Sequence, residues 1–426
     1  MVIHVIKPGD TVYSIARAHD VPMQRIIFDN GLHEPARLTP GQALVILFPK
    51  RVYSVQQGDT LGSIAAKNGM TVYQLWQNNP QLGGNDRIFP GQQLVLEYEG
   101  AKKGALAVNG YAYPNIDLSI LRKTLPYLTY LSVFAFGAQP DGGLSVIDDR
   151  NLPEAAREFG AIPLMVLTTL APDGTFSGER ASCLLNCPAA QQRLIENLIA
   201  YMTAHGYGGV DVDFEYIPPA DRDRYAAFIT LLRQTLNPLG FTVFVALAPK
   251  TSSDQRGLLY EAHDYAQLGQ AANNVLIMSY EWGYAHSAPM AVAPLNKVRQ
   301  VMQYAVSAIP STRIFMGIPN YGYDWTLPHV PGQSVAQSIG NVAAVEQAVN
   351  RGASIAFDET AQSPFYNYYR DRVEHEVWFE DARSIESKLA LAHEFHLHGV
   401  SVWNIMRYFP QLWLVLNDQY IIQKQD

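Results

Sequence analysis

The chain has 426 residues, of which 48% are hydrophobic and 16% charged, a composition typical of two or three globular domains and not of a disordered chain. Its formal net charge of −8 argues against nucleic acid as a partner. No apolar run of about 18 residues predicts a membrane span, and no charged segment followed by an apolar one predicts a signal peptide.

The first hundred residues contain a duplication. Residues 6–16 recur as 55–65 at an offset of 49, and the Pro-Gly-Gln tripeptide at 40–42 recurs at 90–92. Such self-similarity indicates tandem copies of one unit. In each copy a Gly-Asp-Thr turn, whose Asp or Thr can cap a helix, follows a short strand. The pattern predicts strand, helix, helix and strand in each unit.

Both copies resemble the LysM domain, which binds glycans that contain N-acetylglucosamine. The resemblance covers residues 2–48 and 51–98 and implies a βααβ fold, with a glycan groove between the first strand–helix loop and the second helix–strand loop. The candidate glycan contacts that it implies are Asp10, Thr11, Asn30, Asp59, Thr60 and Asn79. Modules that serve only as spacers or protein contacts are the alternative.

After a short polar linker at 99–104, strand and helix patterns alternate over residues 105–426. The predicted strands are 107–111, 130–136, 162–168, 209–215, 242–248, 275–280, 313–319 and 399–404. Apolar residues at i, i+4 spacing predict a helix over 192–204, between the third and fourth strands. Eight such strand–helix units favour a (β/α)8 TIM barrel, an α/β fold whose active sites lie at the C-terminal ends of the strands.

The most informative stretch is Tyr-Gly-Gly-Val-Asp-Val-Asp-Phe-Glu-Tyr at 207–216. As a strand, it places Asp211, Asp213 and Glu215 on one face and three apolar residues on the other. Neighbouring carboxylates raise one another's pKa, which suits a site that must hold a proton at neutral pH. An exposed edge strand with a solvated acidic face is the alternative, and the apolar opposite face argues against it.

This motif resembles the Asp-x-x-Asp-x-Asp-x-Glu signature of glycoside hydrolase family 18, the chitinase-like enzymes, although its first Asp falls on Gly208. The resemblance implies that Glu215 is the general acid and that the substrate's own 2-acetamido group is the nucleophile. It further implies that Asp213 orients the acetamide and that Asp211 shares a proton or hydrogen bond with Asp213.

Other positions extend the family resemblance. Met-Ser-Tyr-Glu at 278–281 resembles the family's Met-x-Tyr-Asp, which implies that Tyr280 binds the acetamido oxygen. Trp403 takes the place of the tryptophan under the −1 sugar. The candidate wall residues are Glu281, Trp282, Asn320, Tyr321 and Tyr323, for which core or loop packing is the alternative. The segment at about 326–380 resembles the small α+β insertion of the family between strands seven and eight.

Neither a Cys/His ligand cluster nor a Gly-rich phosphate loop is found, so we expect no metal and no cofactor. Cys183 and Cys187, four residues apart, are expected to be free, and His263 beside Asp264 is expected to be structural. Lys250, after the fifth predicted strand, is a further candidate.

Motifs at 246–252, 280–284, 321–328 and 377–385 resemble the spore cortex-lytic N-acetylglucosaminidases of endospore-forming bacteria, the SleL type. This resemblance implies an enzyme of the spore cortex or coat, and we expect a monomer. It would cleave β-1,4 bonds after N-acetylglucosamine in cortex peptidoglycan during germination. A chitinase and a non-catalytic glycan-binding lectin are the alternatives, and the presence of Glu215 argues against the lectin. The sequence leaves open whether cleavage is endo or exo and whether muramic-lactam is required.

Overall fold

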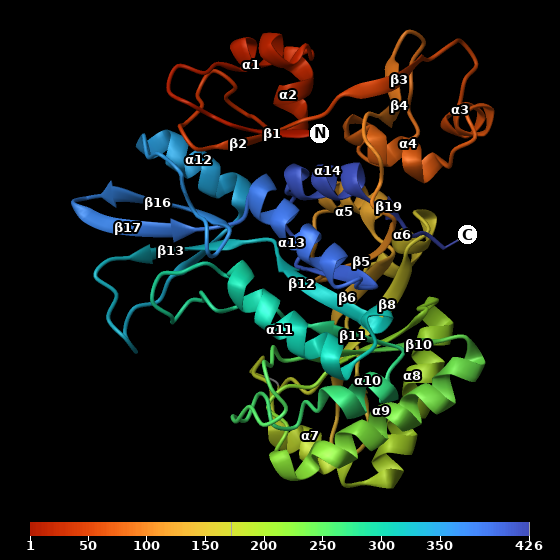
Figure 1. The fold of residues 1–426 in the computed structure, drawn as a ribbon. Coiled ribbons are helices and arrows are strands. Elements are labelled where there is room, and N and C mark those ends of the chain that lie inside the picture. Colours follow the sequence, from red (N-terminus) through yellow and green to blue (C-terminus); the bar gives the residue numbers. More distant parts are fainter. Residues whose placement is uncertain (172, 426) are drawn as a thin grey trace.

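The computed structural model describes residues 1–171 and 173–425, and Figure 1 shows two small modules against the outside of a larger barrel. Each module has two antiparallel strands and two helices, as predicted. The first contains β1 (Val2–Val5), α1 (Val12–His19), α2 (Met23–Asp29) and β2 (Ala43–Ile46). The second contains β3 (Pro49–Ser54), α3 (Leu61–Lys67), α4 (Val72–Asn78), a 3₁₀ turn (Pro80–Leu82) and β4 (Gln93–Tyr98).

The first helix of each module starts in the same way, and the cause is local to the repeated sequence. Thr11 and Thr60 are the N-caps of α1 and α3, and the hydroxyl of each accepts the backbone N–H of the serine three residues later. The serine hydroxyl in turn bonds to the backbone of the cap residue, which completes a capping box. The threonine of the Gly-Asp-Thr turn therefore satisfies helix donors that would otherwise lack partners.

The eight parallel barrel strands form a closed ring, since β5 pairs with both β18 and β6. In ring order from β5 the strands are β5 (Ala105–Ala112), β6 (Tyr130–Ala138), β8 (Ile162–Thr168), β9 (Gly209–Asp213), β10 (Thr242–Leu247), β11 (Asn274–Ile277), β12 (Ile314–Pro319) and β18 (Gly399–Trp403). Two short strands pair with members of the ring: β7 (Leu144–Ser145) is antiparallel to β6, and β19 (Ile421–Ile422) is parallel to β5. The predicted TIM barrel is confirmed.

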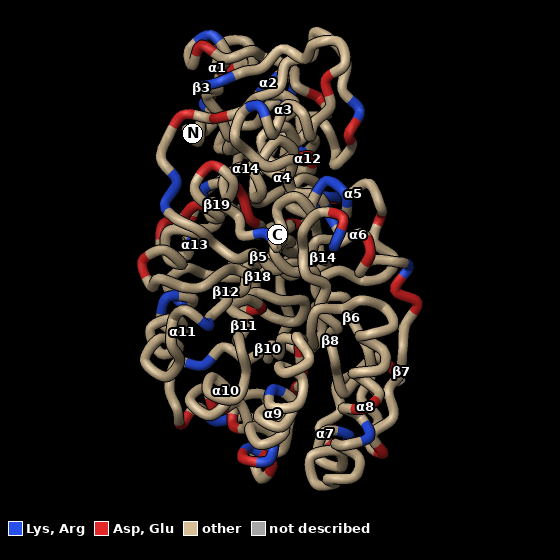
Figure 2. Tube along the Cα trace, turned by 90° about the vertical axis from the view of Figure 1, so that its right-hand side faces the viewer, with Lys and Arg blue, Asp and Glu red and all other residues tan. Residues whose placement is uncertain are grey.

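Helices surround the strands, as Figure 1 shows. They are α5 (Leu118–Thr124), α6 (Leu152–Glu158), α7 (Gly178–Leu185), α8 (Pro188–His205), α9 (Arg222–Leu236), α10 (Tyr265–Ala271), α11 (Leu295–Ala308), α13 (Ala382–Glu394) and α14 (Pro410–Gln419). Their apolar sides pack on the outward faces of the strands. In Figure 2 acidic and basic residues are interspersed around this outer layer. Among the described helices, none is both long enough and apolar enough to span a membrane.

The inward faces of the strands build the barrel interior in layers. Tyr130, Phe244 and Phe315 form an aromatic floor with ring centroids 5.0–5.9 Å apart. Towards the C-terminal ends of the strands the inward positions become polar. This cluster consists of Asn109, Ser132, Asp211 and Ser401, all buried. These polar positions, in otherwise apolar strands, lie next to the mouth of the barrel.

A separate five-stranded sheet lies between β12 and β18 in the chain, which confirms the predicted α+β insertion. Its strand order is β14-β13-β17-β16-β15. The elements are β13 (Gly322–Thr326), β14 (Gln337–Ile339), α12 (Asn341–Arg351), β15 (Ala356–Asp358), β16 (Ser363–Arg370) and β17 (Val373–Trp378). Figure 1 shows this sheet projecting from one side of the barrel.

Two strands end earlier than the sequence pattern predicts. β9 ends at Asp213, which pairs with Thr168, and Tyr216 with φ of 57° turns the chain away from the sheet. β11 ends at Ile277, whose carbonyl accepts the N–H of Ser279 at 2.8 Å. Glu215 and Tyr280 therefore lie on loops at the barrel mouth, and the predicted alternation along one continuous strand was wrong for these two residues.

The two modules are docked on the barrel and not loosely tethered by the linker. In the second module, the Gln77 amide donates to the carbonyl of Pro126 at 2.8 Å, and its carbonyl accepts the Tyr127 hydroxyl at 3.0 Å. In the first, the Thr39 hydroxyl donates to the carbonyl of Ala353 at 2.6 Å. Even the linker takes part, since its residue 103 donates a backbone N–H to the chain near the end of α14.

Candidate active site

Asp211 lies deepest in the acidic row. One of its oxygens accepts the hydroxyl of Tyr111 at 2.6 Å and that of Ser132 at 3.0 Å. Burial raises the pKa of Asp211 to about 6, although these two hydrogen bonds favour the charged form. The first Asp of the family signature has no room here, because a Cβ on Gly208 would collide with the side chain of Ile162.

Asp213 lies between the other two carboxyl groups and is only 6% exposed. Burial, then the charges of Glu215 and Asp211, raise the pKa of Asp213 well above its usual range. Burial also raises the pKa of Glu215 to about 7. The row can therefore hold a proton at neutral pH, and its members titrate as a coupled set. Within the described residues, one oxygen of Asp213 is buried without a hydrogen-bond partner.

Tyr280 follows β11 and lies beside the acidic row. The pKa of its hydroxyl is raised by burial and then by the charges of Asp213 and Glu215, which keeps it protonated and able to donate. Gly317 of β12 makes room for the ring, since a Cβ at that position would lie 2.7 Å from a ring carbon of Tyr280. Strands that lie far apart in the sequence thus bring together the predicted acid Glu215, the predicted orienting carboxylate Asp213 and the predicted hydroxyl donor Tyr280.

Trp403 ends β18 and forms an aromatic plate at the barrel mouth. Its ring packs edge-on against Tyr111 and Phe134, each at 5.2 Å between centroids, and against Tyr113 at 6.2 Å. The indole is only partly buried. The position is suited to stack on the apolar face of a sugar ring.

Glu281 and the tyrosines that follow β12 make one wall of the mouth. The carboxylate of Glu281, on a residue with φ of 66°, accepts the hydroxyl of Tyr321 and that of Tyr323 at 3.1 Å. Trp282 is partly buried next to them, with its backbone N–H bonded to the carbonyl of Val292. The wall therefore presents a fixed acceptor flanked by aromatic rings.

Asn320 has a structural role that differs from the predicted wall position. Its side chain is 2% exposed, and its amide donates to the carbonyls of Asn404 at 2.9 Å and Arg407 at 2.8 Å. It braces the loop behind Trp403. Lys250 is likewise buried, and its ammonium donates to the carbonyl of His263 at 3.2 Å. Both side chains are thus buried and bonded to backbone carbonyls.

The predicted glycan contacts of the modules fall into two groups. Asn30 and Asn79 are buried and use their side chains to join the second helix to the closing strand, with bonds of 2.7–3.0 Å to the backbone. Their side chains are therefore not presented to a ligand. Asp10 and Asp59 accept backbone N–H groups at 2.8 Å and stabilise the first loop. Thr11 and Thr60 cap helices.

The second module carries a surface groove between residues 59–62 and 86–89, and Glu158 of barrel helix α6 completes one edge. Phe89 at its rim is 68% exposed, whereas the matching Thr39 of the first module is 4% exposed because it contacts residue 353 of the insertion. Likewise a Cβ on Gly91 would meet nothing, but a Cβ on Gly41 would collide with the backbone of residue 355. The duplicated modules thus differ in what their second loop contacts.

Sequence reasoning missed several residues of the site. Tyr111 and Ser132 hold Asp211, Tyr113 stands beside Trp403, and Phe89 stands on the module groove. The sequence could have indicated Ser132, because it is a polar residue at an inward position of an otherwise apolar strand. No local pattern singled out Phe89, since its exposure depends on what the second module leaves uncovered.

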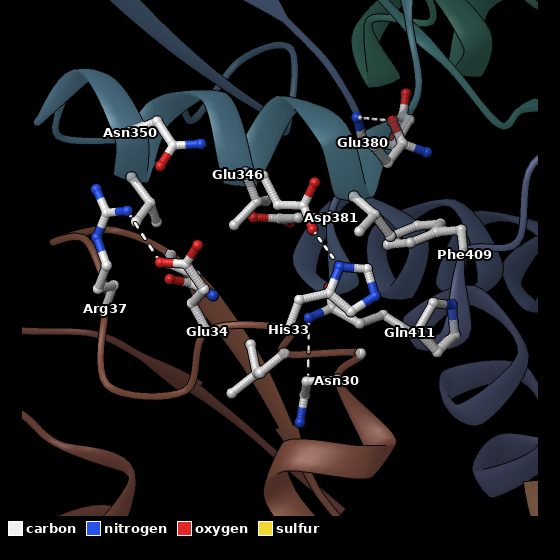
Figure 3. Close-up of a pocket in the computed structure, with 18 residues that line it drawn as sticks. Asn30, His33, Glu34, Arg37, Glu346, Asn350, Glu380, Asp381, Phe409 and Gln411 are labelled. Carbon is white, nitrogen blue, oxygen red and sulfur yellow. Dashed lines mark hydrogen bonds and ion pairs between the residues drawn. The ribbon is translucent and has the colours of Figure 1, made fainter. Parts of the chain in front are cut away.

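A separate cavity lies between the first module and helix α12 (Figure 3). His33 pairs with Glu346 across it at 2.5 Å, and Arg37 pairs with Glu34 on the module side at 2.9 Å. The acidic groups deeper in, such as Glu380, have cationic partners in the interior. This cavity belongs to the docking interface and lies outside the barrel mouth.

The described residues contain no group of three or more His, Cys, Asp or Glu arranged to hold a metal ion. Cys183 and Cys187 are both exposed and free of a disulfide, as expected.

Comparison with known proteins agrees with this geometry. Residues 173–407 match the family described as Glycosyl hydrolases family 18, and residues 4–47 and 53–97 each match the LysM domain. The chain belongs to glycosyl hydrolase family 18. This hydrolase is 36% identical over 431 residues to the cortical fragment-lytic enzyme of Bacillus anthracis, with 99% of both chains covered. It is 37% identical to that of Bacillus subtilis, with 88% of this chain and 99% of the relative covered.

The family 18 hydrolase also superposes on a crystal structure of the spore cortex-lytic enzyme SleL from Bacillus megaterium. The TM-score is 0.85 at 37% identity, and the match covers 100% of this chain and 99% of SleL. The predicted resemblance to the SleL type is confirmed over the whole length, both LysM modules included.

Proposed function

We propose that this protein is a spore cortex peptidoglycan N-acetylglucosaminidase that cleaves the β-1,4 bond after N-acetylglucosamine. The observation that carries the proposal is the row Asp211–Asp213–Glu215 at the barrel mouth, whose last member has a pKa raised to about 7. A protonated carboxyl at neutral pH can give its proton to a leaving glycosidic oxygen.

Glu215 acts as the general acid. Family 18 enzymes do not use a second enzyme carboxylate as nucleophile but the substrate itself, so the acetamido oxygen of the −1 sugar attacks its own anomeric carbon. Asp213 orients the acetamide and stabilises the resulting oxazolinium ion. The buried oxygen of Asp213 that lacks a protein partner supports this role, because an acetamide N–H is a suitable donor to it.

Tyr280 donates its hydroxyl to the acetamido oxygen and holds it near the anomeric carbon. Asp211 shares a proton or hydrogen bond with Asp213, while Tyr111 and Ser132 keep Asp211 in place. Trp403 supports the sugar ring from below. Glu281, Trp282 and Tyr321 contact the sugar hydroxyls from the wall, and Asn320 contributes only by holding the loop behind Trp403.

The substrate assignment is supported by the full-length similarity to enzymes whose names state that they lyse spore cortex and its fragments. We infer a location in the spore cortex or coat and activity during germination. The LysM modules bind the same glycan. The groove of the second module, with Asp59 and Thr60 at one wall and Phe89 at the other, is the better supported site.

The proposal is tested by incubating the full-length protein with purified cortex, with germination-derived cortex fragments and with chitin oligosaccharides. Mass spectrometry then identifies the new reducing ends. Products that end in N-acetylglucosamine from cortex material, and none from the Glu215→Gln variant, are expected. Preferential release of chitooligosaccharides would replace cortex with chitin as the substrate.

A second arm tests the nucleophile. Glycan whose acetyl groups have been removed should resist hydrolysis, because no internal nucleophile remains. A thiazoline analogue of N-acetylglucosamine should inhibit competitively by resembling the cyclised intermediate. Cleavage of de-N-acetylated glycan at a comparable rate would mean that Asp213 or Asp211 attacks directly, contrary to the proposed mechanism.

A further inference from the structure

His263 is a buried histidine that joins the loop before α10 to two barrel strands. Its side chain is 1% exposed. The backbone N–H of Ala248, one residue after β10, donates to its Nδ1 at 2.8 Å. Its Nε2 lies 3.0 Å from the carbonyl oxygen of Phe214, the residue directly before Glu215. The ring thus spans the C-terminal ends of β10 and β9.

The two contacts determine the tautomer of the ring. Because Nδ1 accepts a backbone N–H, it cannot carry a proton, so the proton of the neutral ring is on Nε2 and is donated to Phe214. Burial lowers the pKa of His263 to about 4, and the nearby ammonium of Lys250 acts in the same direction. The ring is therefore neutral at neutral pH, with one acceptor and one donor.

The Phe214 carbonyl needs a partner from outside the sheet. The pairing of β9 with β10 ends at Val212 and that with β8 ends at Asp213, so no neighbouring strand is paired with Phe214. The side chain of Phe214 is held in the outer core, stacked on Tyr225 at 5.9 Å between centroids. With its ring and its carbonyl both fixed, Phe214 presents the next residue, Glu215, from a rigid backbone.

We propose that His263 is a positioning residue for catalysis, which fixes the backbone before Glu215 so that the carboxyl group is held in line with the leaving oxygen. The inference rests on the proposed role of Glu215 as the acid. His263 touches neither substrate nor the reacting atoms and does not exchange a proton. Its contribution is the hydrogen bond from Nε2 to the Phe214 carbonyl.

Tyr265, two residues on, offers a matched control. Its hydroxyl donates to the carbonyl of Ala248 at 2.7 Å and accepts the N–H of Lys250 at 2.9 Å. It is as deeply buried as His263 and is held to the same segment after β10. In the described part of the chain no hydrogen bond joins the Tyr265 side chain to the segment that carries Glu215, so its loss costs stability without disturbing the acid.

Two amide substitutions separate the two bonds of the ring. In His263→Gln the side-chain N–H₂ occupies the place of Nε2 and keeps a donor for Phe214. In His263→Asn the amide oxygen occupies the place of Nδ1 and keeps an acceptor for Ala248, but the donor to Phe214 is lost. Tyr265→Phe and Glu215→Gln complete the set, with kcat and KM measured on a soluble cortex fragment and stability measured by urea unfolding.

We expect His263→Asn to lower kcat by about 10-fold or more with KM nearly unchanged, since small misplacement of a catalytic group is costly. His263→Gln should retain kcat within about threefold, and Tyr265→Phe should lose stability while keeping kcat. Adding His263→Asn to Glu215→Gln should lower the residual rate no further, because residues that act through one group are not additive.

The outcomes separate the inference from the proposed function. Full activity of Glu215→Gln would overturn both. An inactive Glu215→Gln together with a His263→Asn variant of normal kcat would overturn only the positioning role, as would equal losses in His263→Asn, His263→Gln and Tyr265→Phe. Nitrogen NMR of the wild-type imidazole gives a test that needs no variant: an Nδ1–H tautomer, or a protonated ring between pH of about 5 and 8, would also overturn it.

Discussion

At the scale of single residues, burial is the main cause of the protonation states in this site. Water is excluded from the acidic row, so the charged forms are disfavoured and the pKa values of Asp211 and Glu215 rise to about 6 and about 7. The same burial keeps the Tyr280 hydroxyl protonated. One environment therefore suits both proposed roles, a proton donor for the leaving group at Glu215 and a neutral donor for the acetamide at Tyr280.

The pH dependence of activity should follow Glu215. Because the acid must be protonated to work, kcat/KM should fall as pH rises through about 7. Initial rates on a soluble cortex fragment across the pH range give the profile, and Asp213→Asn should move it, since that change removes a charge that is coupled to Glu215. A rate that stays constant far above neutral pH would contradict a titrating acid at this position.

The stability of the protein should depend on pH through the same residue. The pKa of Glu215 rises from 4.5 to about 7 on folding, so the folded state binds more protons in this window and its stability falls as pH increases. Glu215→Gln has no such titration. The variant should match wild type below the window and be more stable by up to about 3 kcal/mol above it.

Urea unfolding of both proteins near the two ends of that pH window measures the difference in the free energy of unfolding. The quantity of interest is the change in the difference between variant and wild type, because groups that do not interact with Glu215 titrate equally in both proteins. A difference that shrinks with rising pH would show that the pKa of Glu215 is lowered on folding and not raised.

At the scale of elements, the ends of the strands decide what the site can do. β9 and β11 stop at Asp213 and Ile277, which frees Glu215 and Tyr280 to face the mouth from loops. The neighbouring strand β12 then has to leave space. It does so with Gly317, whose missing side chain is the space that the Tyr280 ring occupies.

Gly317→Ala should therefore disturb Tyr280. The added Cβ would lie 2.7 Å from both a ring carbon of Tyr280 and the carbonyl oxygen of Ile277, so the ring or the strand has to move. We expect a loss of stability of about 1–3 kcal/mol and a fall in kcat as large as that of Tyr280→Phe. Combining the two changes should cost little more activity than either alone, and full additivity in kcat would indicate that Gly317 acts elsewhere.

At the scale of the whole molecule, the modules and the barrel are one packed body. A single hydrophobic cluster runs from Leu75 and Trp76 of the second module through the barrel helices to Trp413. Trp76 and Phe159 of the barrel have ring centroids 4.8 Å apart. Deleting residues 1–100 would expose this surface, so point variants are the better test of glycan targeting than truncation.

Phe89→Ala should weaken binding to insoluble peptidoglycan while leaving cleavage of small soluble fragments intact. Loss of one aromatic stacking surface is worth about 1 kcal/mol, or roughly 5-fold in affinity. Co-sedimentation with intact sacculi gives the affinity. Phe28→Ala is the control, because that phenyl group is 47% exposed on α2 of the first module and lies outside the groove. Equal losses in both variants would argue against a specific role for the groove of the second module.

Local patterns in the sequence were sufficient to predict much of the fold and of the candidate site. The duplicated Gly-Asp-Thr turns predicted two βααβ modules because helix caps are local hydrogen bonds within a few residues. The alternation of strand and helix predicted the barrel, and the acidic row predicted Asp211, Asp213 and Glu215 as candidate site residues. These features depend on neighbours in the chain, which the sequence shows directly.

The features that only the tertiary structure revealed depend on partners that lie far apart in the chain. The partners of Asp211 come from β5 and β6, the space for Tyr280 comes from β12, and the bond that fixes the Phe214 carbonyl comes from the loop at 263. Asn320 and Asn79 look like exposed contacts in the sequence, but packing turns both inward. Burial and long-range hydrogen bonds arise only when the strands close into a barrel, so no local pattern could have determined them.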